Sequence, residues 1–179
     1  MTLINKQCLF SLKNIIILLV SFICLPSQAN TNKAKSVQDT YVQVVNKIIT
    51  SNDCFSDEIA LIKPRLLDGG EPNDQTFNTR FNPDIFVDFY ADNGVVNGAT
   101  ITALPVPNKP EETLRFICIA AAVQSTIDST RSINEFKRID QDKFLLTQSE
   151  KSVSYKSKYF EHAFSIDSTG MIVQIGNGD

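Results

Sequence analysis

The sequence predicts an α+β domain in which N-terminal helices pack on an antiparallel sheet. Three observations support this class: an apolar helical stripe opens the domain, a hairpin signal lies near residues 84–104, and short strand-like segments follow near 143–175. Helices come mainly first and strands mainly later, an order typical of helices segregated to one side of an antiparallel sheet. We expect a single globular domain over residues 36–179, after a leader (1–29) and a disordered stretch (30–35).

Residues 1–29 have the pattern of a secretory signal peptide. Lys6 and Lys13 precede an apolar run of 11 residues, and Ser27-Gln28-Ala29 then places small residues where signal peptidase cleaves. A retained membrane anchor is the weaker alternative, because spanning a bilayer takes about 20 apolar residues. We therefore expect an exported protein, periplasmic or secreted, that has no membrane attachment after cleavage.

The net charge of the exported chain argues against nucleic-acid binding. Loss of the leader leaves 15 basic and 20 acidic residues, a net charge of −5, whereas nucleic-acid binders present a concentrated basic surface. Residues 53–92 hold nine acids against three bases, an asymmetry that can steer a charged partner. Another protein is the expected partner, and no cofactor is expected.

The first third of the domain reads as helical. A capping sequence at Ser36–Asp39 and an apolar stripe at helical spacing predict a helix over 37–51. The stripe consists of Val37, Tyr41, Val44, Val45 and Ile48. A second helix is expected from Ser56 to about Lys63, where Pro64 would end it. Residues 69–83, with two glycines and two prolines, are expected to form a loop.

Two β-rich segments, 84–91 and 95–104, predict a hairpin. Asn93-Gly94 lies between them, and Asn-Gly is the strongest short hairpin signal. Asn97-Gly98 offers a second turn four residues later, so the register stays open between the two.

The segment 111–130 fits two interpretations. Pro110 and the two glutamates after it suit a helix start, as does the run Ala120–Ala122, whereas Ile117 and Val123 suit a strand equally well. We favour a buried helix.

The last third is expected to hold most of the sheet. A capping box predicts a short helix over 132–139. Strand segments at 144–146, 153–166 and 171–175 then predict an antiparallel meander, and Asp167–Gly170 is the turn joining the last two.

Two of the four cysteines, Cys8 and Cys24, belong to the leader. Cys54 and Cys118 remain as an even pair in an oxidising compartment. The sequence has no Cys-x-x-Cys motif, and the apolar stretch around Cys118 would raise its pKa, so a reactive thiol is disfavoured. We predict a Cys54–Cys118 disulfide.

No catalytic constellation stands out, so no catalytic residue and no metal ligand is assigned. His162 is the only histidine, which excludes sites built from several histidines, and no Gly-x-Ser-x-Gly elbow is present. Acids along the 84–92 strand recur about every 13 Å, wider than the roughly 5 to 9.5 Å of a glycosidase pair. We therefore expect a non-enzymatic protein.

Two functional hypotheses follow. The first is an exported interaction protein, such as an inhibitor, an immunity protein or an envelope accessory factor. Its candidate surface is one face of a strand where acids and aromatics alternate, formed by Asp84, Phe86, Asp88, Tyr90 and Asp92. The second is a small-molecule binder or hydrolase with a pocket at His162. A histidine that alternates with apolar residues is more often a hydrogen-bonded packing residue.

Overall fold

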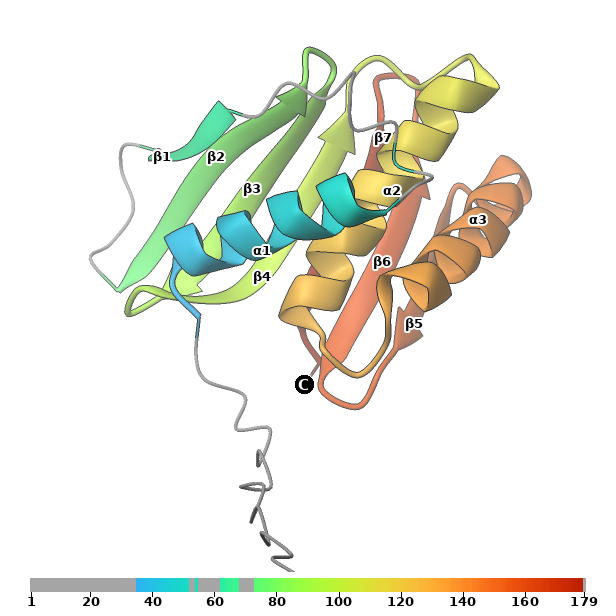
Figure 1. The fold of residues 1–179 in the computed structure, drawn as a ribbon. Helices are drawn as coiled ribbons and strands as arrows, with labels where there is room; N and C mark the ends of the chain where they lie inside the picture. Colours follow the sequence, from blue (N-terminus) through green and yellow to red (C-terminus); the bar gives the residue numbers. More distant parts are fainter. Residues whose placement is uncertain (1–34, 52–53, 55–61, 68–72, 179) are drawn as a thin grey trace, which may run out of the picture. The chain divides into compact units, whose positions relative to one another are not determined.

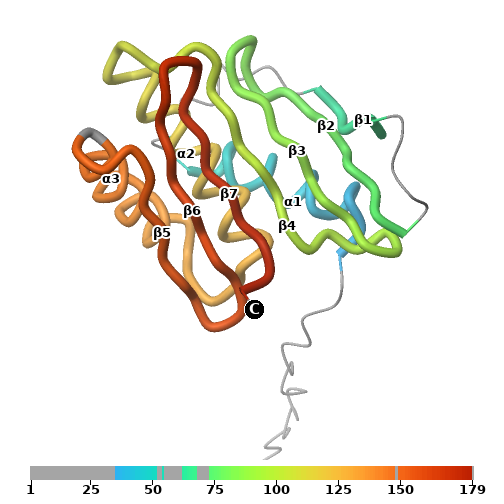
Figure 2. Tube along the Cα trace, turned by 180° about the vertical axis from the view of Figure 1, so that it is seen from behind, coloured from blue at the N-terminus to red at the C-terminus, as the bar shows by residue number. Residues whose placement is uncertain are grey.

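Three helices cover one face of a seven-stranded antiparallel sheet in the computed structural model of this protein (Figure 1). The structure describes residues 35–51, 54, 62–67 and 73–178. Seen from behind, the sheet lies in front, and no helix of the described chain covers this second face (Figure 2). The predicted α+β class is confirmed. The leader expected at 1–29 lies outside the described residues.

The sheet consists of two meanders joined along β4 and β7. The strand order is β1-β2-β3-β4-β7-β6-β5, and every neighbouring pair is antiparallel. The strands are β1 (Ile62–Leu66), β2 (Asp74–Asn82), β3 (Ile85–Asp92), β4 (Val95–Ala103), β5 (Ser152–Lys156), β6 (Phe160–Ile166) and β7 (Met171–Asn177). In the chain, helices α2 (Pro110–Ile127) and α3 (Ile133–Glu150) separate the first meander (β1–β4) from the second (β5–β7). The two meanders then pair through β4 and β7.

Helix α1 (Val37–Thr50) forms where its apolar stripe predicts it. The Ser36 side chain caps it by accepting a hydrogen bond from the Asp39 N–H at 3.1 Å. Val44 and Ile48 of the stripe are fully buried against the sheet side of the domain. Lys35, at the end of the stretch expected to be disordered, accepts a bond at its carbonyl from the Val96 N–H at 3.0 Å.

The region between α1 and β3 differs from expectation. Most of the helix expected at 56–63 lies outside the described residues, but Ile62 and Lys63 belong to β1. Pro64 is tolerated because β1 is an edge strand, where a missing N–H breaks no ladder bond on the outer side.

The prediction of a loop over residues 69–83 is wrong for Asp74–Asn82, which form the nine-residue strand β2. Thr79 and Phe81 are buried on the helix side, while Asn78 and Arg80 face away from it. Asn, Asp and Arg are poor strand formers, so pairing with β3 decides this segment rather than its own propensity.

The turn Asn93-Gly94 joins β3 to β4, which settles the open register. Both residues have positive φ, 49° and 77°, as a two-residue type I′ turn requires. Asn97-Gly98 lies inside β4 instead, and a bulge at Tyr90/Ala91 absorbs the extra residue.

Helix α2 confirms the helical interpretation of 111–130. It is buried along most of its length from Phe116 to Thr126, so its β-branched residues pack on all sides instead of alternating. The predicted disulfide is also confirmed: Cys54 is joined to Cys118 of α2, with the Cα atoms 5.4 Å apart. No helix of the described chain is long and apolar enough to span a membrane.

Helix α3 is longer than expected. The capping box at Ser132 and Glu135 is present, but the helix continues through 144–146, which was expected to be a strand. Leu145 and Leu146 are exposed on it, at 63% and 43%, so their apolar character reflects no burial. The strands expected over 153–166 and 171–175 are found as β5, β6 and β7.

Candidate functional site

The candidate interaction surface lies on the open face of the sheet. Along β3, Ile85, Val87, Phe89 and Ala91 are buried under the helices, while Phe86, Asp88, Tyr90 and Asp92 point the other way. We call these last four the β3 row. Asp84, the fifth predicted member, is exposed in the turn before β3 rather than in the strand.

Neighbouring strands hold the β3 row in place. The Asn78 amide of β2 donates to the Asp88 carboxylate at 2.6 Å, and the Tyr90 and Thr100 hydroxyls are bonded at 2.8 Å. The Arg80 guanidinium lies 4.5 Å from the centre of the Phe86 ring, a cation–π arrangement. The open face is therefore an ordered polar surface with two aromatic rings in it.

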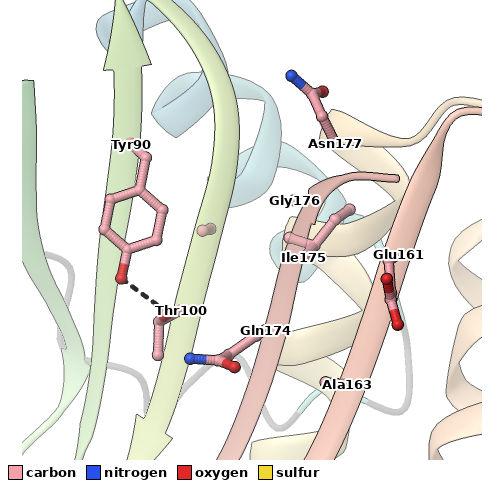
Figure 3. A pocket seen from close by; sticks show the side chains of 9 residues that line it. Tyr90, Thr100, Glu161, Ala163, Gln174, Ile175, Gly176 and Asn177 are labelled. Carbon is pink, nitrogen blue, oxygen red and sulfur yellow. Dashed lines mark hydrogen bonds between the residues drawn. The ribbon is translucent and has the colours of Figure 1, made fainter. Parts of the chain in front are cut away.

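A hollow of about 340 Å³ adjoins the β3 row at Tyr90 (Figure 3). Its walls come from four strands in the order β3, β4, β7 and β6. The polar side chains that line it are Tyr90, Thr100, Glu161, Gln174 and Asn177.

Gly176 lines this hollow, and Gly98 is buried beside the Tyr90 ring at its edge. Tyr90 pairs with Gly98 and Glu161 pairs with Gly176, while Ala99 pairs with Ile175, so the two glycines are neighbours across β4 and β7. No side chain rises between Tyr90 and Glu161 over a distance of three strand spacings, about 14 Å. The β6 wall of the hollow carries the Glu161 carboxylate, which forms an ion pair with the Lys156 ammonium at 3.8 Å.

The packing of the strands requires a glycine at position 98 but not at position 176. A Cβ on Gly98 would lie 2.8 Å from the Ile175 carbonyl oxygen, so close approach of the strands explains this glycine. A Cβ on Gly176 would meet nothing within 4 Å. Packing in the described structure therefore does not require a glycine at 176, and any side chain there would enter the hollow.

A second, smaller cavity of about 150 Å³ lies near the β2–β3 turn. It is lined by Asp84, Pro105, Glu112 and Arg115 among others. Asp84 thus belongs to this cavity, and the structure does not bring it together with the β3 row.

His162 lies in the interior, and neither cavity is lined by it. Its Nε2 is 3.0 Å from the Asp128 carboxylate, and its Nδ1 is 3.2 Å from the Gln124 amide. The Tyr155 and Phe136 rings pack against the imidazole. This environment is that of a hydrogen-bonded packing histidine and leaves no open side for a substrate.

Burial and hydrogen bonding determine the pKa values of His162 and Asp128. Burial lowers the pKa of His162, although Asp128 opposes the shift. Burial alone would raise the pKa of Asp128, but hydrogen bonds from Thr130, Ser157 and His162 outweigh it and hold that pKa below its usual value. The pair is therefore a neutral imidazole beside an ionised carboxylate.

Sequence reasoning missed three polar residues that surround His162. Gln124, Asp128 and Asp140 are fully buried; Gln124 directly follows the apolar run of α2, and Asp128 is the C-cap of that helix. A glutamine within so apolar a stretch was the available signal, because buried polar side chains need partners. In the described residues, no group of three or more His, Cys, Asp or Glu side chains is arranged to hold a metal.

No family model matches this sequence, and comparison with curated proteins and with solved structures finds no significant match. The function is therefore inferred from the residues themselves.

Proposed function

We propose that this protein is an exported, non-enzymatic interaction protein that binds another protein on the open face of its sheet. The β3 row is the centre of the contact, and the hollow beside Tyr90 receives a side chain of the partner. An inhibitor, an immunity protein or an envelope accessory factor would each use such a surface.

The β3 row is the observation that carries this proposal. An open face alone is ordinary for an antiparallel sheet, since such sheets often have one solvated side. Here, however, Phe86 and Tyr90 are only half-buried on that face, with Asp88 between them and Asp92 beyond Tyr90. Aromatic side chains with a polar rim are the composition that protein interfaces favour over the rest of the surface.

The charges on this face favour a basic partner segment. Asp74 of β2 and Asp92 of β3 are directly paired across the strands, and like charges in that position repel. Arg80, the base nearest the row, already stacks on Phe86. Lysine or arginine side chains of a partner would relieve the repulsion and be attracted from a distance.

Export is supported by two features of the chain. The N-terminal pattern is that of a cleaved leader, and the Cys54–Cys118 disulfide is typical of oxidising compartments. A binding protein in the periplasm or outside the cell meets its partners there.

Site-specific photo-crosslinking tests the proposal. A photoreactive residue placed at Asp88 should form a covalent adduct with one protein in living cells, and mass spectrometry should locate the linkage in a basic segment. The matched control carries the photoreactive residue at Leu145, which is exposed on α3 and away from the sheet. Adducts of equal yield from both positions would contradict the proposal.

Truncation of the rings tests which residues supply the affinity. The double variant Phe86→Ala/Tyr90→Ala should weaken binding of the crosslinked partner by at least tenfold, about 1.4 kcal/mol, while the protein stays folded. Unchanged affinity in a folded double variant would remove the β3 row from the interface.

A further inference from the structure

Four fully buried side chains form a continuous polar network inside the domain. Asp140 comes from α3, Gln124 and Asp128 from α2 and its C-terminal end, and His162 from β6. The contacts run in series from Asp140 to Gln124, then to His162, then to Asp128. We call these four side chains the buried network.

The three contacts of the buried network require three hydrogens. The Gln124 amide presents its nitrogen to one neighbour and its oxygen to the other, so it supplies one hydrogen. A neutral His162 supplies a second. The third must come from a proton on Asp140, from a proton on Asp128, or from a second ring proton on His162. With none of these, one contact places two acceptors against each other, whichever way the amide and the imidazole tautomer are arranged.

The surroundings of the two carboxyl groups favour a proton on Asp140. One Asp128 oxygen already accepts from the Thr130 N–H at 3.1 Å and from the Thr130 hydroxyl at 2.6 Å, which suits an ionised carboxylate. One Asp140 oxygen lies 2.6 Å from the Gln124 amide, and the amide–imidazole contact on the other side is 3.2 Å. With the proton on Asp140, the Gln124 oxygen accepts from Asp140 and the Gln124 nitrogen donates to His162 Nδ1.

We propose that Asp140 is a neutral carboxylic acid and that its proton is the switch of the buried network. With the proton in place, unbroken hydrogen bonds join α2, α3 and β6. When the Asp140 O–H bond ionises, the proton passes to bulk water and one contact is left with two facing acceptors. Turning the Gln124 amide only moves this conflict from Asp140 to His162. This device does not depend on the proposed function.

The surrounding groups agree with a neutral acid. Burial raises the pKa of Asp140 well above its usual value, and only a Gln124 amide turned to donate to the carboxylate would oppose that shift. Burial lowers the pKa of His162, which keeps the second ring proton off the imidazole. The other charged or titratable groups around the buried network come from three elements: Arg131 before α3, Lys143 on α3 and Tyr155 on β5.

The sign of the pH dependence follows from these protonation states. Unfolded Asp140 loses its proton above about pH 3.8 while the folded state keeps it, so the free energy of unfolding falls as pH rises toward the folded pKa. His162 has the opposite effect below pH 6.5, since its folded pKa is lowered. Above pH 6.5 the histidine is neutral in both states and no longer offsets Asp140, whereas Lys47, with a pKa lowered to about 8, raises the free energy of unfolding at alkaline pH.

The single histidine gives a direct measurement. His162 is the only histidine of the chain, so the imidazole ¹⁵N spectrum of the purified protein contains one residue. At pH 7 we expect one protonated and one bare nitrogen, with the hydrogen on Nε2. Two protonated ring nitrogens at pH 7 would overturn the proposal, because the third hydrogen would then lie on His162.

Two variants isolate the role of the Asp140 proton. Asp140→Asn keeps a donor toward Gln124 and should remove the loss of stability that Asp140 causes in the unmodified protein as pH rises above 6.5. Asp142→Asn makes the same substitution at an exposed position of α3 and should leave that loss unchanged. A loss of equal size in Asp140→Asn would overturn the proposal, and the ¹⁵N measurement decides it if that variant does not fold.

Discussion

The ring of Tyr155 lies flat on the ring of His162, with the centroids 4.6 Å apart and the planes inclined by 5°. Tyr155 belongs to β5, a five-residue strand at the edge of the sheet, whereas His162 belongs to the neighbouring strand β6. The Tyr155 hydroxyl also contacts the Gln124 amide at 3.3 Å. The stacked pair therefore ties the edge strand to α2.

Substitutions at Tyr155 should separate the contribution of its hydroxyl contact with Gln124 from that of its stacking on His162. Tyr155→Phe keeps the stack and loses only the hydroxyl contact, which costs about 0.5–1.5 kcal/mol. Tyr155→Leu also removes the aromatic pair, adding about 0.5–1.5 kcal/mol. Urea unfolding of both variants measures the difference, and equal destabilisation would show that the stack contributes nothing.

The two glycines of the hollow should respond oppositely to alanine. Gly98→Ala should destabilise the fold by about 1–3 kcal/mol, because its Cβ would press on the Ile175 carbonyl oxygen. Gly176→Ala should leave stability unchanged or slightly higher, since its Cβ meets open space. Thermal unfolding of the two variants side by side tests this order. A larger loss for Gly176→Ala would contradict the geometry.

The disulfide should supply a large share of the stability. Cys54 and Cys118 are 64 residues apart, and closing a loop of this size stabilises by about 4 kcal/mol in the chain-entropy model. The double variant Cys54→Ala/Cys118→Ala should lose most of this amount in chemical denaturation. Intact mass should rise by about 2 Da on reduction of the purified protein, from the two hydrogens that two free thiols gain over a disulfide; no rise would mean that the bond is absent.

Lys47 should be unusually reactive at mildly alkaline pH. Its ammonium is half-buried between α1 and α2, where it donates to the Ser125 hydroxyl at 2.9 Å. Burial, with repulsion from Lys35, lowers the pKa of Lys47 to about 8. Acylation followed by mass spectrometry should therefore show a midpoint near pH 8 at this residue.

The charge of Lys35 should account for part of that shift. Lys35→Gln should raise the Lys47 midpoint, whereas Lys158→Gln, in the β5–β6 turn, should not. Because the folded pKa of Lys47 lies below its unfolded value of 10.5, the unfolded state binds more protons between these two pH values. Lys47 therefore makes the free energy of unfolding rise with pH over this interval.

Local signals were sufficient where residues close in sequence decide the structure. The stripe of α1, the Asn93-Gly94 turn and the capping box at Ser132 each act within one or two turns of chain, and each is present as expected. They were insufficient for β2, whose polar residues form a strand only because β3 pairs with them. The end of α3 was missed for the converse reason, since exposed Leu145 and Leu146 imitate a strand core.

The candidate site shows the same division. Alternation along β3 was enough to place Phe86, Asp88, Tyr90 and Asp92 on one face. It could not show that Tyr90 borders a hollow, because the other lining residues lie on β4, β7 and β6, and only the strand order makes these strands neighbours.

The sequence by itself determined the first helix, the central hairpin and the cysteine pair, because each depends on short-range chemistry or on a count. Only the tertiary structure decided that His162 is enclosed and joined to Gln124, Asp128 and Asp140. Gln124 and His162 are 38 residues apart and meet only when α2 packs on β6. Their protonation depends on that burial, since removal from water is what keeps a carboxylic acid neutral.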